Sequence, residues 1–108
     1  MLVDDYQKEA VSTAVYGEGN KIIYPTLGLC GEAGEVAEKI KKVLRDKAGV
    51  FDDERKQEIA KELGDVMWYI ANIANDLGFN LETICQMNLE KLFSRRDRNK
   101  IHGEGDNR

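Results

Sequence analysis

Apolar residues recur at helical intervals in the stretch Ile59-Ala-Lys-Glu-Leu-Gly-Asp-Val-Met-Trp-Tyr-Ile-Ala-Asn-Ile-Ala-Asn-Asp-Leu77. The apolar positions are 4, 3, 4, 3 and 4 residues apart, and they are Ile59, Leu63, Val66, Ile70, Ile73 and Leu77. This spacing puts them on one face of a helix that packs against other helices. Asp52 or Asp53 can cap its start, and Gly78 suits its end.

A second apolar seam precedes this one and predicts a helix from about Pro25 to Asp46, with Leu29, Ala33, Val36, Ile40 and Val43 spaced 4, 3, 4 and 3 residues apart. Weaker patterns predict helices over about residues 2–15 and, from a cap at Asn80, to about residue 98. Residues 1–108 therefore form one all-α domain, a four-helix bundle, with 99–108 as a glycine-containing tail. Two long seams in so short a chain also predict that bundles pair into dimers.

Cysteine and histidine are too scarce for several classes of site. The chain has two cysteines, Cys30 and Cys85, with no CxxC pair, and one histidine, His102. This excludes a zinc ribbon, a multi-histidine metal site and most catalytic triads. Both cysteines fall in apolar helical patterns, so we expect buried thiols.

The charge is unevenly distributed. The net charge is −4; residues 91–108 carry six bases and three acids, a charge of +3, which leaves −7 for residues 1–90. One short basic end does not match the broad basic face of a nucleic-acid-binding protein, and a small phosphate-bearing ligand fits better. No apolar run is long enough to span a membrane, and the acidic start differs from a secretory signal, so we expect a cytoplasmic protein.

A short internal repeat places paired acids on both seam helices. Its copies are Glu32-Ala-Gly-Glu35-Val36 and Glu62-Leu-Gly-Asp65-Val66. The acids stand at i and i+3, side by side on one face, and both pairs lie on the same flank of their seams. Packing of the two helices can gather four carboxylates, whose repulsion requires a cation; oxygen ligands favour Mg²⁺ or Mn²⁺. The alternative is that both pairs lie on solvated helix faces.

Glycines inside both copies of the repeat have a second implication. Gly34 and Gly64 are poor helix residues, at about 1 kcal/mol each relative to alanine. Their matching placement indicates a close approach to the backbone at these two points.

These residues resemble a known family. The two acidic copies, separated by the 26 residues Val36–Lys61, are similar to the ExxE, spacer, ExxD motif of MazG-like nucleoside triphosphate pyrophosphohydrolases. Asn88-Leu-Glu-Lys91-Leu-Phe-Ser-Arg95 resembles the family's NxxKLxxR helix, and Gly103-Glu-Gly-Asp-Asn-Arg108 resembles a GxGDNR ending seen in some members. The resemblance implies a bundle of the all-α NTP pyrophosphatase type, assembled as a homodimer or homotetramer, that uses Mg²⁺ to convert an NTP or dNTP to the monophosphate and pyrophosphate.

The resemblance also implies roles for single residues. Glu32, Glu35, Glu62 and Asp65 would hold magnesium, with Mn²⁺ as a possible substitute. Lys91 and Arg95 would meet the phosphates, with Asn88 beside them as a metal or phosphate contact. The alternative for Lys91 and Arg95 is that they belong to a solvent-exposed basic face of the helix. Asn88 occupies a seam position, where a buried amide needs a partner.

Other candidates for catalysis and substrate binding follow from residue chemistry. A carboxylate can orient the attacking water, and Glu35 or Glu38 is the candidate, although Glu38 can equally be a plain surface acid. Trp68 and Tyr69 can stack on a nucleobase or serve the core. Base choice depends on pocket shape, for which these two aromatics and the loop 16–24 are candidates. The last three residues either close over the substrate or belong to a frayed C-terminus; they are Asp106, Asn107 and Arg108.

A second hypothesis uses the same seams. The chain would then be a helical dimerisation or nucleotide-sensing module that binds a nucleotide or a partner helix without turnover.

Overall fold

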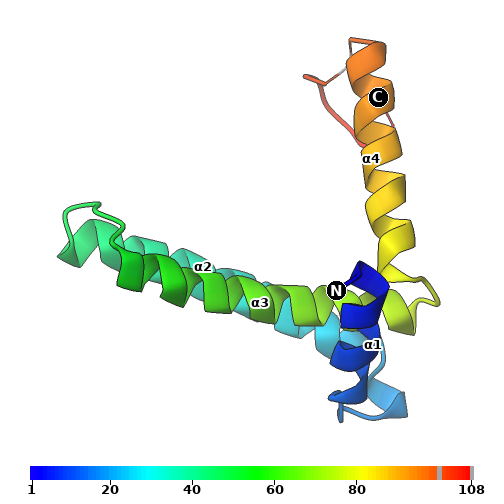
Figure 1. Ribbon diagram of the computed structural model, residues 1–108, viewed down its shortest axis with the longest axis horizontal. Helices are drawn as coiled ribbons and strands as arrows, with labels where there is room; N and C mark the ends of the chain where they lie inside the picture. Colours follow the sequence, from blue (N-terminus) through cyan, green and yellow to red (C-terminus); the bar gives the residue numbers. More distant parts are fainter. Residues whose placement is uncertain (100, 108) are drawn as a thin grey trace.

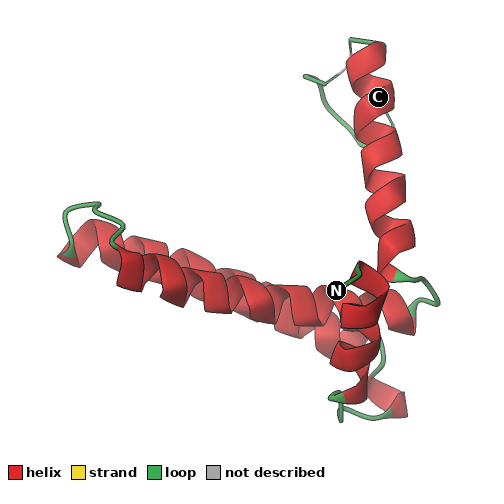
Figure 2. Ribbon diagram, in the orientation of Figure 1, coloured by secondary structure: helices red, strands yellow, loops and turns green. Residues whose placement is uncertain are grey.

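The all-α class is confirmed by a computed structural model that describes residues 1–99 and 101–107. Within those residues the chain forms four α-helices and one short 3-10 helix, and no strand (Figure 2). The elements are α1 (Val3–Ser12), η1 (Glu18–Asn20), α2 (Ile23–Asp46), α3 (Asp53–Asp76) and α4 (Leu81–Asp97). No helix in the described part of the chain combines the length and the apolar content needed to cross a membrane.

Helices α2 and α3 form a long antiparallel hairpin, and α1 crosses one end of it (Figure 1). Asp52 caps α3 by accepting a hydrogen bond from the Arg55 backbone N–H at 2.8 Å. Gly78 follows α3 with φ of 85°, the left-handed conformation that suits glycine. Both ends of α3 therefore lie where the sequence predicts them.

Helix α4 leads away from the hairpin as an arm (Figure 1). Its start packs against the other helices, because Leu81 joins Ala10 and Ala71 in the core where α1 meets α3. The radius of gyration is 16.8 Å, whereas a compact domain of this length has about 13 Å. The four helices of a single chain therefore do not form a closed bundle, because α4 extends away from the other three.

The start of α4 is capped by side chains from α1. The buried Gln7 side chain accepts from the Leu81 N–H at 2.9 Å, and Asp4 accepts from the Glu82 N–H at 3.0 Å. Asn80 lies at the N-cap as predicted, but its side chain makes no capping hydrogen bond. The cap comes from residues far away in the sequence, so local signals could not identify it.

Helix α1 is shorter than predicted, ending at Ser12 rather than near residue 15. The Ser12 and Thr13 hydroxyls donate to the carbonyls of Glu9 and Ala10 at 2.6 and 2.7 Å. Such side chains favour helix ends because they compete with the helical backbone pattern.

Two expectations about buried residues, the two thiols and the Asn88 amide, are wrong for the single chain. Cys30 and Cys85 are exposed, and so is Asn88. They lie on faces of α2 and α4 that no other described part of the chain covers. A seam pattern identifies a face suited to packing but does not identify its partner.

A close contact with a helix backbone occurs at a glycine that the repeat did not indicate, and the contacting group is a side chain. A Cβ on Gly28 would lie 2.1 Å from the Tyr69 ring, whereas a Cβ at Gly34 or Gly64 would meet no described atom within 4 Å outside its chain neighbours and its own helix backbone. Gly28 therefore lets α2 and α3 pack around the Tyr69 ring.

Candidate functional site

Three of the four repeat carboxylates meet on one side of the α2–α3 hairpin. Glu32 comes from α2, and Glu62 and Asp65 come from α3; one oxygen of each lies within 4.8 Å of the others. The antiparallel pairing of the two seams places them together. We call Glu32, Glu62 and Asp65 the carboxylate cluster.

The negative charges of this cluster are only partly compensated. The pKa of Glu32 is raised, chiefly by a hydrogen bond with Glu62, then by desolvation and by the charges of Asp65, Glu62 and Glu35. Lys39 lies 3.8 Å from Glu62, a long ion pair. Three oxygen donors that repel one another form a set that suits a hard divalent cation such as Mg²⁺.

A hollow of about 330 Å³ opens beside the cluster and is lined by Glu32, Asp65, Trp68 and Tyr69. The Trp68 and Tyr69 rings meet edge to face, with centroids 5.0 Å apart. Trp68 also packs against the core, and its indole N–H donates to the Thr13 hydroxyl at 2.8 Å. The two aromatics therefore combine a packing role with a wall of the hollow.

Glu35 and Glu38 lie outside the cluster. Glu35 is exposed, yet close enough for its charge to raise the pKa of Glu32. Glu38 forms an ion pair with Lys41 at 3.0 Å, and that partner lowers the pKa of Glu38. The structure thus brings Glu35 near the cluster and leaves Glu38 paired along its own helix.

The predicted phosphate contacts lie on the arm. Lys91 and Arg95 share one face of α4, and both bind the tail residue Asp106. Lys91 Nζ is 2.6 Å and Arg95 Nη2 is 3.3 Å from Asp106 Oδ1, and Arg95 also donates to the Asp106 carbonyl. Lys91 is the main cause of a lowered pKa at Asp106. A carboxylate therefore sits where an anionic ligand of this basic pair would bind.

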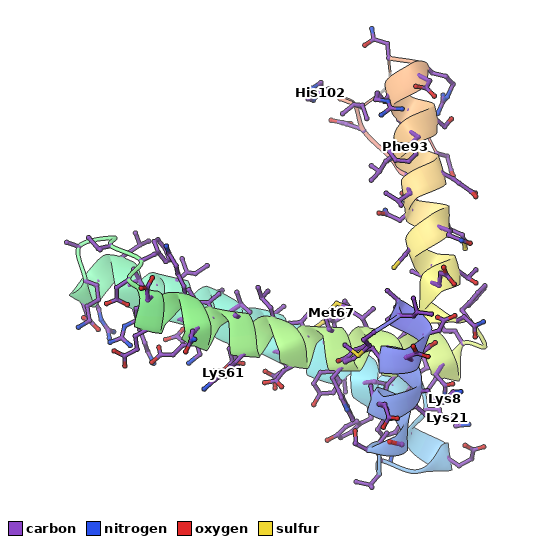
Figure 3. The ribbon with its side chains drawn as sticks, in the orientation of Figure 1. Lys8, Lys21, Lys61, Met67, Phe93 and His102 are labelled. Atoms are coloured by element: carbon purple, nitrogen blue, oxygen red, sulfur yellow. The ribbon has the colours of Figure 1, made fainter. Side chains whose placement is uncertain are left out.

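These groups do not reach the carboxylate cluster within one chain. Phe93, between the two bases in the sequence, lies far along α4 from the hairpin (Figure 3). Asn88 is exposed on α4, and Asn107 is exposed in the tail. Arg108 lies outside the described residues.

An anchor for the loop before α2 was missed by the sequence analysis. The Asp76 carboxylate accepts from the Tyr16 hydroxyl at 2.7 Å and from the Ile22 N–H at 2.9 Å. The only sequence signal was an acid at the end of an apolar helix, which equally fits a surface residue.

A sequence model of the MazG nucleotide pyrophosphohydrolase domain matches residues 25–99. The chain belongs to the MazG family. The matched segment contains the whole carboxylate cluster and the two predicted phosphate contacts, Lys91 and Arg95. Membership indicates nucleotide pyrophosphohydrolase activity at the level of the family.

Two curated relatives are similar to this MazG chain. Gene 37 protein of Mycobacterium phage L5 is 53% identical over 114 aligned positions that cover 100% of both chains. The uncharacterized protein YvdC of Bacillus subtilis (strain 168) is 36% identical over 72 residues, 62% of this chain and 68% of the relative. Neither name states an activity, and no solved structure matches the chain.

Proposed function

We propose that this MazG protein hydrolyses a nucleoside or deoxynucleoside triphosphate to the monophosphate and pyrophosphate with Mg²⁺, for which Mn²⁺ can substitute. The observation that supports it best is the carboxylate cluster beside an open hollow. Glu32, Glu62 and Asp65 are the residues that would hold the metal. Their oxygen donors and incompletely neutralised charge fit such an ion.

The reaction is attack of water on the α-phosphorus. A new P–O bond forms, the bond from the α-phosphorus to the bridging oxygen breaks, and pyrophosphate leaves with that electron pair. Bound magnesium would neutralise triphosphate charge and make a water molecule more acidic. Glu35, exposed and near the cluster, is the favoured carboxylate to orient the water and accept its proton; the ion pair of Glu38 with Lys41 makes Glu38 less suitable.

We also place Lys91, Arg95 and Asn88 in substrate binding, contributed by a second copy of the chain. The arm of α4 holds the basic pair away from its own carboxylate cluster, and it exposes Leu89, Leu92 and Phe93. Packing of this face against another copy buries apolar surface and brings bases toward the cluster. Light scattering after size-exclusion chromatography should give a dimer or tetramer; a monomer at micromolar concentration would contradict this assembly.

A product assay tests the proposed activity. Canonical and modified NTPs and dNTPs are incubated with Mg²⁺ or Mn²⁺, and pyrophosphate and monophosphate are quantified. At least one nucleotide should give both products in equal amounts, and Asp65→Asn should lower the rate by about a hundredfold or more. Glu9→Gln, which removes an exposed carboxylate from α1, is the matched control.

Two results would contradict the proposal. One is release of three separate phosphates, and the other is full activity in Asp65→Asn. A nucleotide that raises the melting temperature with Mg²⁺ but is never cleaved would favour the nucleotide-sensing module instead.

A further inference from the structure

A second hollow lies next to the one beside the carboxylate cluster, and the two share Trp68 as a wall. It has a volume of about 200 Å³. We call it the aromatic slot, and its lining includes Thr13, Tyr16, Asn20, Tyr24 and Trp68. The lining carries no charged side chain, in contrast to the acidic hollow on the other side of Trp68.

The aromatic slot is built on a fixed loop. The Tyr16 and Tyr24 rings stack with centroids 5.2 Å apart and an interplanar angle of 24°. Asp76 binds both the Tyr16 hydroxyl and the Ile22 N–H. Ile22 has φ of 68°, which is strained for a β-branched residue, so the surrounding contacts must hold the loop in place. Such strain is often found at ligand-binding sites.

In the aromatic slot, the oxygen Asn20 Oδ1 can accept a hydrogen bond from a ligand. The Asn20 amide nitrogen donates to the Tyr16 carbonyl at 3.0 Å, which fixes the orientation of the amide group. Among the residues that the structure describes, none donates to Asn20 Oδ1. Trp68 cannot serve as this donor because its N–H is already used by Thr13.

We propose that the aromatic slot binds the nucleobase of the triphosphate substrate and that Asn20 and Tyr24 determine base affinity. Stacked rings and a neutral lining suit a flat heterocycle, and Asn20 Oδ1 accepts from a ring or exocyclic N–H of the base. The phosphates then extend past Trp68 toward the carboxylate cluster. This inference rests on the proposed function for the identity of the ligand.

Binding measurements separate the base from the phosphates. Calorimetry with Mg²⁺ compares the α,β-imido analogues of dATP, dGTP, dCTP and dTTP, which resist cleavage at the α-phosphate, with inorganic tripolyphosphate. Asn20→Ala and Tyr24→Leu should each weaken the best-bound analogue by about tenfold. Both should leave tripolyphosphate affinity within about twofold, because that ligand has no base to place in the slot.

Matched controls change an asparagine and an aromatic residue outside the aromatic slot. Asn75→Ala changes an exposed asparagine on α3, and Phe51→Leu changes an exposed aromatic before α3. Neither should alter binding of the analogues.

The outcomes distinguish this inference from the proposed reaction. Equal weakening of tripolyphosphate and analogue, or no weakening of either, would overturn the base assignment, as would a wild-type protein that binds tripolyphosphate but no analogue. If Asn20 and Tyr24 control analogue binding while no triphosphate is cleaved, the proposed hydrolysis fails and the base site stands.

Discussion

Gln7 is a buried side chain that joins three parts of the molecule. Its amide nitrogen donates to the carbonyls of Ala71 and Phe79 at 3.2 and 3.0 Å, and its oxygen accepts from Leu81. Gln7→Leu should lower the free energy of unfolding by about 2–4 kcal/mol, because buried backbone groups lose their partners. Urea denaturation at fixed protein concentration measures the change.

The control for Gln7 is Gln57→Leu on the exposed side of α3, which should change stability by less than about 0.5 kcal/mol. Equal effects of the two substitutions would show that the Gln7 hydrogen bonds add nothing to stability.

At the scale of residues, the sequence predicted the meeting of the carboxylates better than the long-range contacts of Gln7 and Asp76. The matched spacing placed both acid pairs on the same flank of their seams and predicted that all four carboxylates gather. The structure brings three of them together, Glu32, Glu62 and Asp65, and leaves Glu35 outside the cluster. Gln7 and Asp76 escaped notice because their partners are more than fifty residues away in the sequence. A short-range pattern contains no record of such contacts.

Charge repulsion in the carboxylate cluster leads to two predictions about the melting temperature of Glu32→Gln, one without Mg²⁺ and one with it. The raised pKa of Glu32 means that folding favours its protonated form, so its contribution to stability is lost as the pH rises through that pKa. Glu32→Gln should therefore raise the melting temperature at pH 7 in EDTA. The same change should reduce the rise in melting temperature that millimolar Mg²⁺ produces, because a ligand is lost.

Thermal unfolding with and without Mg²⁺ tests both signs, and Glu9→Gln should leave both values as in the wild type. A lower melting temperature of Glu32→Gln in EDTA, or an undiminished response to Mg²⁺, would argue against a metal site under electrostatic strain.

The packing of α2 on α3 depends on the absence of a side chain at Gly28. Gly28→Ala places a Cβ against the Tyr69 ring and should destabilise the protein by about 1–3 kcal/mol. Gly34→Ala has open space and should stabilise it by about 0.5–1 kcal/mol, since alanine favours a helix. Denaturation of both variants checks the signs, and the same sign in both would contradict this packing.

The tail binds the arm through Asp106, and this contact depends on charge. The pKa of Asp106 is lowered, so docking is complete above the ordinary carboxyl range and is lost as the pH falls through the lowered value. Asp106→Asn should release the tail at pH 7. His102, the one histidine of the chain, gives a proton NMR signal that should narrow on release.

Glu104→Gln removes a different tail acid and should leave the His102 signal broad. Release should also free Lys91 and Arg95 to bind tripolyphosphate more tightly, which calorimetry can measure. If Asp106→Asn leaves both signal and affinity unchanged, the basic pair does not hold the tail.

At the scale of elements, the periodic helices were predicted closely and the irregular segments were not. The bounds of α3 followed from Asp52 and Gly78, whereas α1 ended early at Ser12 and Thr13, whose hydroxyls bind backbone carbonyls. The direction of α4 depends on how Gln7 and Leu81 fix its first turn. That direction is a tertiary property, so helical periodicity predicts the arm but not where it points.

At the scale of the whole molecule, the basic pair Lys91 and Arg95 lies on the arm of α4, away from the carboxylate cluster on the hairpin, and this separation supports a site shared between copies. Coexpression of Asp65→Asn with Lys91→Ala gives mixed assemblies in which one site combines an intact cluster with an intact base. If substrate lies between copies, two inactive variants should together regain about a quarter of wild-type activity. If each chain forms its own site, the mixture should be no more active than either variant alone. Full activity of Lys91→Ala by itself would show that Lys91 has no role in the reaction. A regained pyrophosphatase rate would therefore show that the arm of one copy serves the carboxylate cluster of another.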